Sequence, residues 1–376
     1  MFAPTRLFLS LRPRAAPALI ASASAVAALF AATPFLLPAV ADRFDVSLGT
    51  SALISSAQVA GFAATTFAAA RRLTPSRGIL VGAALTSVVA NAASAGVDVF
   101  VLLLVLRVAA GVAAGLLVWL AWTDAMRDTR VMRDVAAIGP ATMLVAAPLF
   151  GWLASTGGDR PVYLALAAAS IPVMLLPAPF GGERKLRRRM SPSRSNVVLL
   201  VGLGLLTMFG SSLFVFIASI GSTQNGMGPV AVALGYSVNA VAAFVGARVG
   251  TRPEFAWRFV LVMAGAVALV AFVHEPVALY IGMATWGFAF WMTVPGVLRQ
   301  IADWSLVPEE RVGDAQAMMA LGRAIGPLIG AALVGADSFG GLSLTVVSGL
   351  AGVAAIMGGV SRYRKSRSPV APGTAV

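Results

Sequence analysis

Charged residues are scarce in this chain of 376 residues. Asp, Glu, Lys and Arg make up 11% of it, whereas they make up about a quarter of a typical soluble domain. Apolar residues make up 59%, and the mean hydropathy is +0.87. Too few charged side chains are present to cover a water-exposed surface, so we expect an integral membrane protein.

Cysteine is absent, and His274 is the only histidine. Disulfides, iron–sulfur clusters and zinc sites made of cysteine and histidine are therefore excluded, and we expect no metal and no cofactor. The only two lysines, Lys185 and Lys365, each follow an arginine. Neither fits the lysine of a Walker A phosphate loop, so ATP hydrolysis is not expected and no catalytic residue is assigned.

Uncharged runs of about 20 residues, long enough to cross a bilayer, recur along the whole chain. The first run contains "PAVAD", an Ala-x-Ala pattern that is also compatible with a cleaved signal peptide. Its length and its two prolines favour a membrane span instead. We predict twelve spans, near residues 16–40, 49–70, 78–96, 100–123, 135–155, 161–180, 196–220, 229–249, 257–273, 277–300, 312–335 and 341–360.

The basic residues orient these spans. With a cytoplasmic N-terminus, 24 of the 28 Lys and Arg residues fall in cytoplasmic segments, and only Arg43 and Arg160 fall outside. The positive-inside rule then predicts a multi-pass protein of the cell inner (cytoplasmic) membrane with both termini cytoplasmic. The basic loops would lie against anionic membrane lipids, which accounts for the net charge of +13 without a nucleic-acid partner.

The two halves of the chain look alike. Asp124 and Asp303 each end a predicted span and are 179 residues apart, and "APLFG" recurs as "GPLIG" at the same spacing. A single offset running through several spans is typical of a duplicated unit. We therefore predict an N-terminal six-helix bundle over 1–180, a basic cytoplasmic linker over 181–195, a C-terminal six-helix bundle over 196–361 and a cytoplasmic tail over 362–376.

At this point the chain resembles the major facilitator superfamily. The resemblance rests on the 6+6 spans, on "TPFLLPAVADRFDVS" (33–47), on "LRVAAGVAAG" (106–115) and on the Gly/Pro segments "GPATMLVAAPLFGW" (139–152) and "GRAIGPLIGAALVG" (322–335). The family's usual glutamine is Ala110 here, and the better Gly/Pro copy lies in the eleventh span instead of the fifth. The resemblance implies an all-α membrane protein of twelve transmembrane helices in two six-helix bundles. It also implies alternating access around a cavity lined by helices one, four, seven and ten.

Arg107 is the unusual residue of the fourth span. It lies about seven residues into that span, roughly 10 Å deep, where a charge must face water, a partner or a substrate. Gly111 and Gly115 follow it on one helical stripe. Two interpretations stay open: Arg107 handles substrate or protons in a cavity, or it is a structural latch beside a glycine packing seam.

The other candidate substrate contacts come from the spans that the resemblance places around the cavity. In the repeated half, the position equivalent to Arg107 is Trp286, which is 179 residues further along the chain. Trp286 lies on the same side of the tenth span as Phe290 and Thr293. In the first and seventh spans, residues at a similar depth complete the predicted substrate-binding set. The set is Arg107, Trp286, Phe290, Thr293, Phe30, Thr33, Met208, Ser211 and Ser212.

A second set of residues is predicted to couple protons or to gate the cavity. Asp42, at the outer end of the first span, is the candidate for proton exchange. Asp124 and Asp303 are expected to form charge latches on the cytoplasmic side with nearby arginines. The full set is Asp42, Asp124, Asp303, Arg71, Arg72, Arg252 and Arg323, with Arg323 deep in the eleventh span.

Three classes of function remain at this stage. The first is a secondary active transporter that works by alternating access as proton-coupled efflux of a small organic molecule, functional as a monomer. The second is an uptake carrier or uniporter for a small, anionic metabolite. The third is a non-transporting membrane protein such as an enzyme, but no nucleophile, metal cluster or cofactor loop supports an enzyme.

Overall fold

The fold is described from a computed structural model. It describes residues 15–125, 129–178, 192–249, 251–306, 308–334 and 339–367. Within these ranges all regular structure is helical. The central basic linker lies almost entirely outside the described residues.

Seven helices form the first half of the chain. Several begin at serine caps, since Ser47 Oγ accepts a hydrogen bond from Thr50 N and Ser76 Oγ accepts one from Ile79 N. The helices are α2 (Pro17–Phe44), α3 (Leu48–Ser51), α4 (Leu53–Arg72), α5 (Arg77–Gly96), α6 (Phe100–Ala125), α7 (Thr129–Gly157) and α8 (Asp159–Leu175).

The second half repeats this order with one interruption, because its first long helix breaks at Val215 and Phe216. The last helix continues to Arg367, so the first residues of the predicted tail from residue 362 are helical. The elements are α9 (Arg194–Phe214), α10 (Ile217–Thr223), α11 (Pro229–Val249), η1 (Pro253–Phe255), α12 (Ala256–Phe272), α13 (Pro276–Asp303), α14 (Pro308–Leu333) and α15 (Gly340–Arg367).

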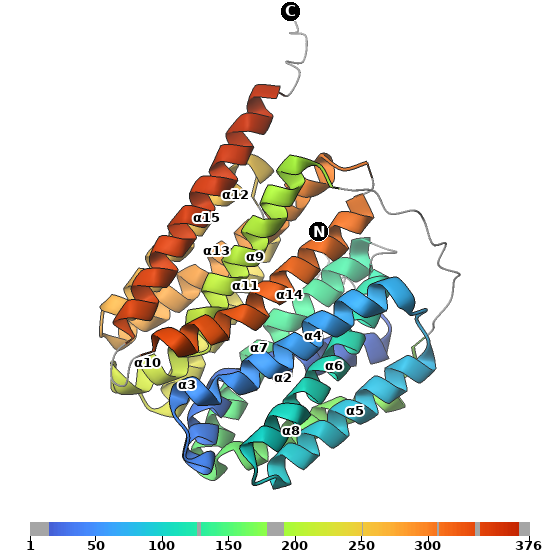
Figure 1. The fold of residues 1–376 in the computed structure, drawn as a ribbon, viewed down its shortest axis with the longest axis vertical. Coiled ribbons are helices and arrows are strands. Elements are labelled where there is room, and N and C mark those ends of the chain that lie inside the picture. The colour runs from blue at the N-terminus through green and yellow to red at the C-terminus, as the bar shows by residue number, and fades with distance from the viewer. Residues whose placement is uncertain are drawn as a thin grey trace, which may run out of the picture.

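Helix packing follows the same scheme in both halves. In the first half α5 packs against α6 and α8, and in the second half α12 packs in the same way against α13 and α15. The halves meet mainly through two pairs, α4 with α14 and α7 with α11. Figure 1 shows the blue-to-green helices grouped apart from the green-to-red ones, with α4 and α14 running side by side between them. This is the arrangement expected of a duplicated helical unit.

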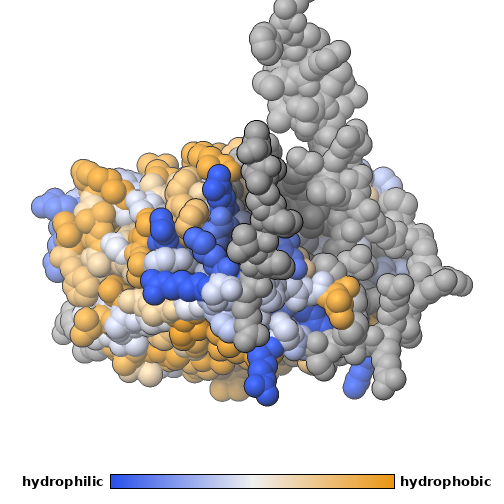
Figure 2. All heavy atoms as spheres, turned by 90° about the horizontal axis from the view of Figure 1, so that it is seen from above, coloured by the Kyte–Doolittle hydropathy of each residue, from blue (hydrophilic) through white to orange (hydrophobic). Residues whose placement is uncertain are grey.

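The exterior of the bundle is apolar, as a membrane requires. Eleven stretches of the described helices are long and apolar enough to span a bilayer. The one predicted span that is not among these eleven, 161–180, corresponds to α8, which has 17 residues. Large apolar side chains stay exposed along the helices, for example Val101 at 67% and Val105 at 58%. In the view of Figure 2, hydrophobic residues (orange) cover much of the flanks and hydrophilic ones (blue) gather nearer the centre. A lipid environment accounts for this surface better than water does.

The two ends of the bundle differ in charge. We call one end the basic face, because Arg72, Arg77, Arg194 and Arg252 lie there at the ends of α4, α5 and α9 and beside η1. We call the opposite end the far face, where α2 ends near Arg43. These two names are kept below.

Candidate functional site

A central cavity of about 330 Å³ lies between the two halves of the bundle. Seven helices contribute to its wall: α2, α4 and α7 from the first half, and α9, α11, α13 and α14 from the second. The contributing residues lie near the middle of the long helices. The cavity is therefore shared by both halves at about mid-membrane depth.

Aromatic rings dominate one side of the central cavity. Phe214, beside the break between α9 and α10, packs edge-on against Trp286 with ring centroids 5.5 Å apart. Phe290 and Trp291 lie one turn further along α13, and Phe30 of α2 lies across from the second half. Such a wall suits the apolar body of a small organic molecule.

Arg323 is the one charged residue among the described residues that line the central cavity. Its direction follows from the packing of α14 on α9. Gly322 and Gly326 contact α9 so closely that a methyl group at either would overlap the Gly204 carbonyl oxygen or Ser211 Oγ. The glycine stripe therefore faces α9, and Arg323, one residue further along the helix, projects from beside it into the cavity.

Five of the nine predicted substrate contacts line this cavity. They are Phe30, Thr33, Ser211, Trp286 and Phe290. Thr293 and Ser212 instead turn into the protein, where Thr293 Oγ1 donates to Ala289 O at 2.9 Å and Ser212 Oγ donates to Phe209 O at 2.8 Å. Met208 is not among the lining residues. The sequence places these side chains at the right depth but does not determine helix rotation.

Sequence reasoning missed most of the cavity wall, including two aromatic residues and an asparagine. Trp291 directly follows the predicted Phe290, and Phe214 lies three residues after Ser211. Asn239 lines the cavity and also donates from Nδ2 to Met283 O at 2.8 Å. The aromatic content of these spans was a usable signal for Phe214 and Trp291. Their orientation was not available from the sequence.

Arg107 lies away from the central cavity, so the expected cavity-facing position is wrong. Its side chain is 1% exposed and lies among α5, α6 and α8. Nη1 donates to Asn91 Oδ1 at 3.0 Å, and Nη2 donates to Ser94 Oγ at 2.6 Å and to Ala90 O at 3.3 Å. The guanidinium carbon also lies 4.5 Å from the ring centroid of Tyr163. This set of partners is that of a structural latch.

The glycines that follow Arg107 explain this rotation. A methyl group at Gly111 would overlap the carbonyl oxygen of Gln58, and one at Gly115 would lie 2.7 Å from that of Phe62. The stripe is thus a seam between α6 and α4. Side chains of α6 that point toward α4 cannot also point toward α5. Arg107 lies about one turn before Gly111 and is rotated away from this seam, so its side chain contacts Asn91 and Ser94 of α5.

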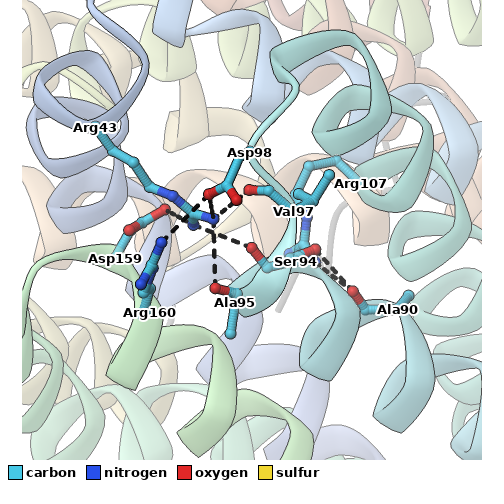
Figure 3. A network of polar contacts seen from close by, with 9 residues as sticks. All are labelled: Arg43, Ala90, Ser94, Ala95, Val97, Asp98, Arg107, Asp159 and Arg160. Carbon is cyan, nitrogen blue, oxygen red and sulfur yellow. Dashed lines mark hydrogen bonds and ion pairs between the residues drawn. The ribbon is translucent and has the colours of Figure 1, made fainter.

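A polar network ties three helices together at the far face (Figure 3). Arg43, near the end of α2, donates from Nη1 to Asp159 Oδ2 at 2.9 Å and to Ser94 O at 3.2 Å. Its Nη2 donates to the carbonyl oxygens of Ala95 and Val97 after the last turn of α5. Asp98 bridges Arg43 and Arg160 at 3.5 and 3.3 Å. The network closes the ends of α2, α5 and α8 onto one another.

Asp159 is the one carboxylate that is buried among the described residues, with 2% exposure. Sequence analysis missed it because it lies just before the predicted span 161–180 and looks like an ordinary loop aspartate. Asp42, which was predicted for proton exchange, is exposed. Both aspartates line a second hollow of about 570 Å³ at the far face, together with Arg43 and Arg160. A buried and an exposed carboxylate therefore share one hollow.

The two halves touch each other between this hollow and the central cavity. Phe35 of α2 packs against Tyr236 of α11 with ring centroids 5.3 Å apart. Ser237 Oγ donates to Leu144 O at 3.0 Å, joining α11 to α7. A methyl group at Gly151 would lie 2.7 Å from Ala233 Cβ. These contacts close the far side of the central cavity.

The predicted latch residues lie at the basic face. Arg72, Arg252 and Asp303 are exposed, and Asp124 is half-buried. The side chain of Arg71 lies outside the described residues. Among the described side chains, Asp303 and Arg252 do not form an ion pair with each other. The latch between them stays a prediction.

Comparison with known proteins agrees with this geometry. Residues 18–331 match the family model of the Major Facilitator Superfamily. Among solved structures, a bacterial homologue of the human lysosomal transporter Spinster, in an inward-facing and occupied conformation, is 14% identical; the match covers 98% of this chain and 100% of that one, with a TM-score of 0.68.

A variant of the nucleoside transporter NupG has the same fold. It is 12% identical, and the match covers 92% of this chain and 98% of that one, again with a TM-score of 0.68. Curated protein sequences contain no significant match. At these identities the likeness to the solved structures concerns the fold alone. The family match, over most of the chain, shows that this protein is a membrane transporter of the Major Facilitator Superfamily and not an enzyme.

Proposed function

We propose that this protein is a secondary active transporter that exports a small organic molecule in exchange for protons. The observation that carries the proposal is the central cavity, whose wall comes from both halves of the chain at mid-membrane depth. When the halves rock against each other, such a cavity opens to one side and then to the other. One chain supplies the whole wall, so we propose that the monomer is the functional unit.

The basic face is proposed to be cytoplasmic. The count of 24 basic residues on that side supports this orientation, through the anionic lipids of the inner leaflet. The contacts of Phe35 with Tyr236 and of Ser237 with Leu144 then close the outer side. In this orientation the central cavity is closed on its outer side, and it is proposed to load a cytoplasmic substrate for export.

Proton coupling is proposed to act through Asp159. The central cavity has no carboxylate among its described lining residues, whereas Asp159 is buried beside Arg43. Protonation of Asp159 would remove its attraction for Arg43 and loosen α2 from α8. The exposed Asp42, in the same hollow, offers a route for the proton from water. The gate at the basic face is proposed to use Asp124 and Asp303 with Arg72 or Arg252 when the inner side closes.

The test is flux through proteoliposomes that contain only the purified protein. Accumulation of candidate fluorescent substrates is measured under three conditions. These are an imposed pH gradient, the same gradient after it has been dissipated, and an imposed gradient across vesicles without protein. Export coupled to protons predicts uphill movement that stops when the gradient is removed. Downhill movement that ignores the gradient would instead support the uniporter, and no movement in any arm for any candidate would contradict transport.

An uptake carrier for an anionic metabolite remains the second candidate. The observation in its favour is Arg323, a cation at the central cavity. The same vesicles distinguish the two, because export and uptake respond in opposite senses to the direction of the gradient.

A further inference from the structure

Arg323 has no hydrogen bond, ion pair or ring contact among the side chains that the structure describes, although it lies in the middle of α14. Arg107 provides the comparison within the same molecule. Its guanidinium has three hydrogen-bond acceptors and an aromatic ring around it. The chain thus contains one intramembrane arginine whose charge is compensated by protein groups and one whose charge is not.

An uncompensated guanidinium at this depth is costly. Even on the lenient scale derived from membrane insertion, an arginine at the centre of a span is among the least favourable residues. Structural arginines in membranes offset that cost with partners, as Arg107 does. Arg323 instead borders the central cavity, so water and whatever molecule enters the cavity are what its charge can meet.

We propose that Arg323 binds the anionic group of the transported molecule, and that this molecule is an amphipathic organic anion with a ring-containing apolar body. The proposal rests on the proposed function, since it names the substrate class of the same cavity. The anionic group is a carboxylate, a sulfonate or a phosphate ester, because each presents oxygens that match the planar donor fork of arginine. The other described lining residues are uncharged, so no acidic side chain competes for Arg323.

The aromatic wall accounts for the second half of the proposed ligand. Trp286, Phe290 and Trp291 are on α13, and Phe214 is on α9, the helix against which α14 packs. An apolar ring placed against these side chains leaves water, while its anionic group reaches Arg323. In a cavity of about 330 Å³ such a ligand is limited to one or two fused rings and a short substituent.

The same geometry predicts which molecules are rejected. A cationic ligand would place two like charges in one small cavity, which is unfavourable at low dielectric. A neutral ligand of the same shape would keep the aromatic contacts and leave the guanidinium without an anion. We therefore expect preference in the order anion, neutral, cation.

The experiment measures binding to the purified full-length protein in detergent. The probes share one ring system: 1-naphthoate, 1-naphthalenesulfonate and 1-naphthyl phosphate as anions, 1-naphthamide as the neutral form and 1-naphthylmethylammonium as the cation. Quenching of tryptophan fluorescence reports binding, with Trp286 and Trp291 at the cavity wall. We expect at least one anion to bind tenfold or more tightly than the amide, with the cation weakest, and the best of the three anions identifies the anionic group.

Two variants connect this preference to Arg323. Arg323→Gln is expected to remove the preference for the anion while leaving the amide bound as before, and Arg323→Lys is expected to retain only part of it. The matched control is Arg299→Gln in α13, an exposed arginine that does not line the central cavity. It should behave as the wild type does. Circular dichroism and thermal unfolding of each variant establish that it is folded.

Three outcomes would overturn the proposal. These are equal binding of the amide and all anions, no binding of any of the five probes, or an anion preference that survives in folded Arg323→Gln. The last would indicate adventitious attraction to the basic surface. Because binding is measured without a gradient, the result is separate from the proposed function: anion preference without flux would contradict transport alone, and flux without anion preference would contradict the Arg323 site alone.

Discussion

Two intramembrane arginines show how one residue type takes opposite roles at the residue scale. Arg107 is enclosed by Asn91, Ser94 and Tyr163, and Arg323 borders a cavity with no such partners among the described residues. The same charge therefore stabilises the fold at one position and is available to a ligand at the other. The difference lies in what the neighbouring helices present, not in the arginines themselves.

Replacing Arg107 with alanine is expected to destabilise the protein. The change leaves Asn91 Oδ1 and Ser94 Oγ without their donor in a buried region, and a buried polar group left without its hydrogen-bond partner costs about 1–3 kcal/mol. Thermal unfolding in detergent, followed by tryptophan fluorescence, measures the loss. Arg299→Ala, at an exposed position of α13, serves as the control. An unchanged unfolding temperature in Arg107→Ala would contradict the latch role.

Replacing Asp159 with asparagine is expected to separate transport from the proton gradient. The asparagine side chain resembles the protonated carboxyl and cannot form the ion pair with Arg43, so the pH-sensitive step is lost. Binding of 1-naphthoate should persist, because Asp159 does not line the central cavity. Flux in proteoliposomes with and without a pH gradient is the measurement, and Asp42→Asn is the companion variant. Retained uphill transport in Asp159→Asn would exclude this carboxylate as the coupling group.

At the scale of elements, close helix contacts decide which side chains reach the cavity. The seam of α14 on α9 turns Arg323 toward the cavity, and the seam of α6 on α4 turns Arg107 away from it. Glycine is required at the contact points, because the backbone of the neighbouring helix occupies the space of a side chain. For these two arginines, the direction of the side chain thus depends on how far around the helix axis the residue lies from the glycines of the seam.

Replacing Gly326 with alanine is expected to disturb the cavity through this seam. The added methyl group would overlap Ser211 Oγ and the Met208 carbonyl oxygen, pushing α14 from α9 at a cost of about 1–3 kcal/mol. We expect a lower unfolding temperature and weaker naphthoate binding. Gly352→Ala in α15 is the control, since nothing lies within 4 Å of a methyl group there. Equal behaviour of the two variants would mean that the seam does not position Arg323.

At the scale of the whole molecule, the two halves are closed against each other on the far side. Alternating access requires that the contacts between α2 or α7 and α11 separate during each cycle. The chain has no native cysteine, so introduced cysteines report on these contacts without background. Conformation can therefore be trapped and released chemically.

A disulfide between Gly151→Cys and Ala233→Cys is expected to block transport. The two positions face each other across α7 and α11, close enough for a disulfide once small shifts are allowed. Oxidation should lock the far side and stop flux, and reduction should restore it. Each single-cysteine variant is the control. Full transport in the oxidised double variant would show that the halves do not separate at this place.

The orientation of the molecule is a separate prediction at this scale. Reporter fusions after Gly182 and at the C-terminus should both report a cytoplasmic location, because both lie in strongly basic segments. A reporter inserted at Gly226, in the turn between α10 and α11, should report the outside. An external signal from either basic segment would reverse the assignment of the two faces.

The class of protein and the course of its helices could be predicted from the amino-acid sequence. Spans such as 229–249 and 78–96 agree with α11 and α5 within a residue, because burial in lipid demands long apolar helices and the demand is visible in composition. The internal repeat and the family resemblance followed from the same linear pattern. Only the tertiary structure decided rotation: whether Arg107 or Arg323 faces the cavity, whether Thr293 turns inward, and whether Asp159 is buried. Those outcomes depend on contacts between helices that are far apart in the chain. Because hydropathy is nearly uniform around a membrane-spanning helix, no periodicity in the sequence marks the side that faces the cavity.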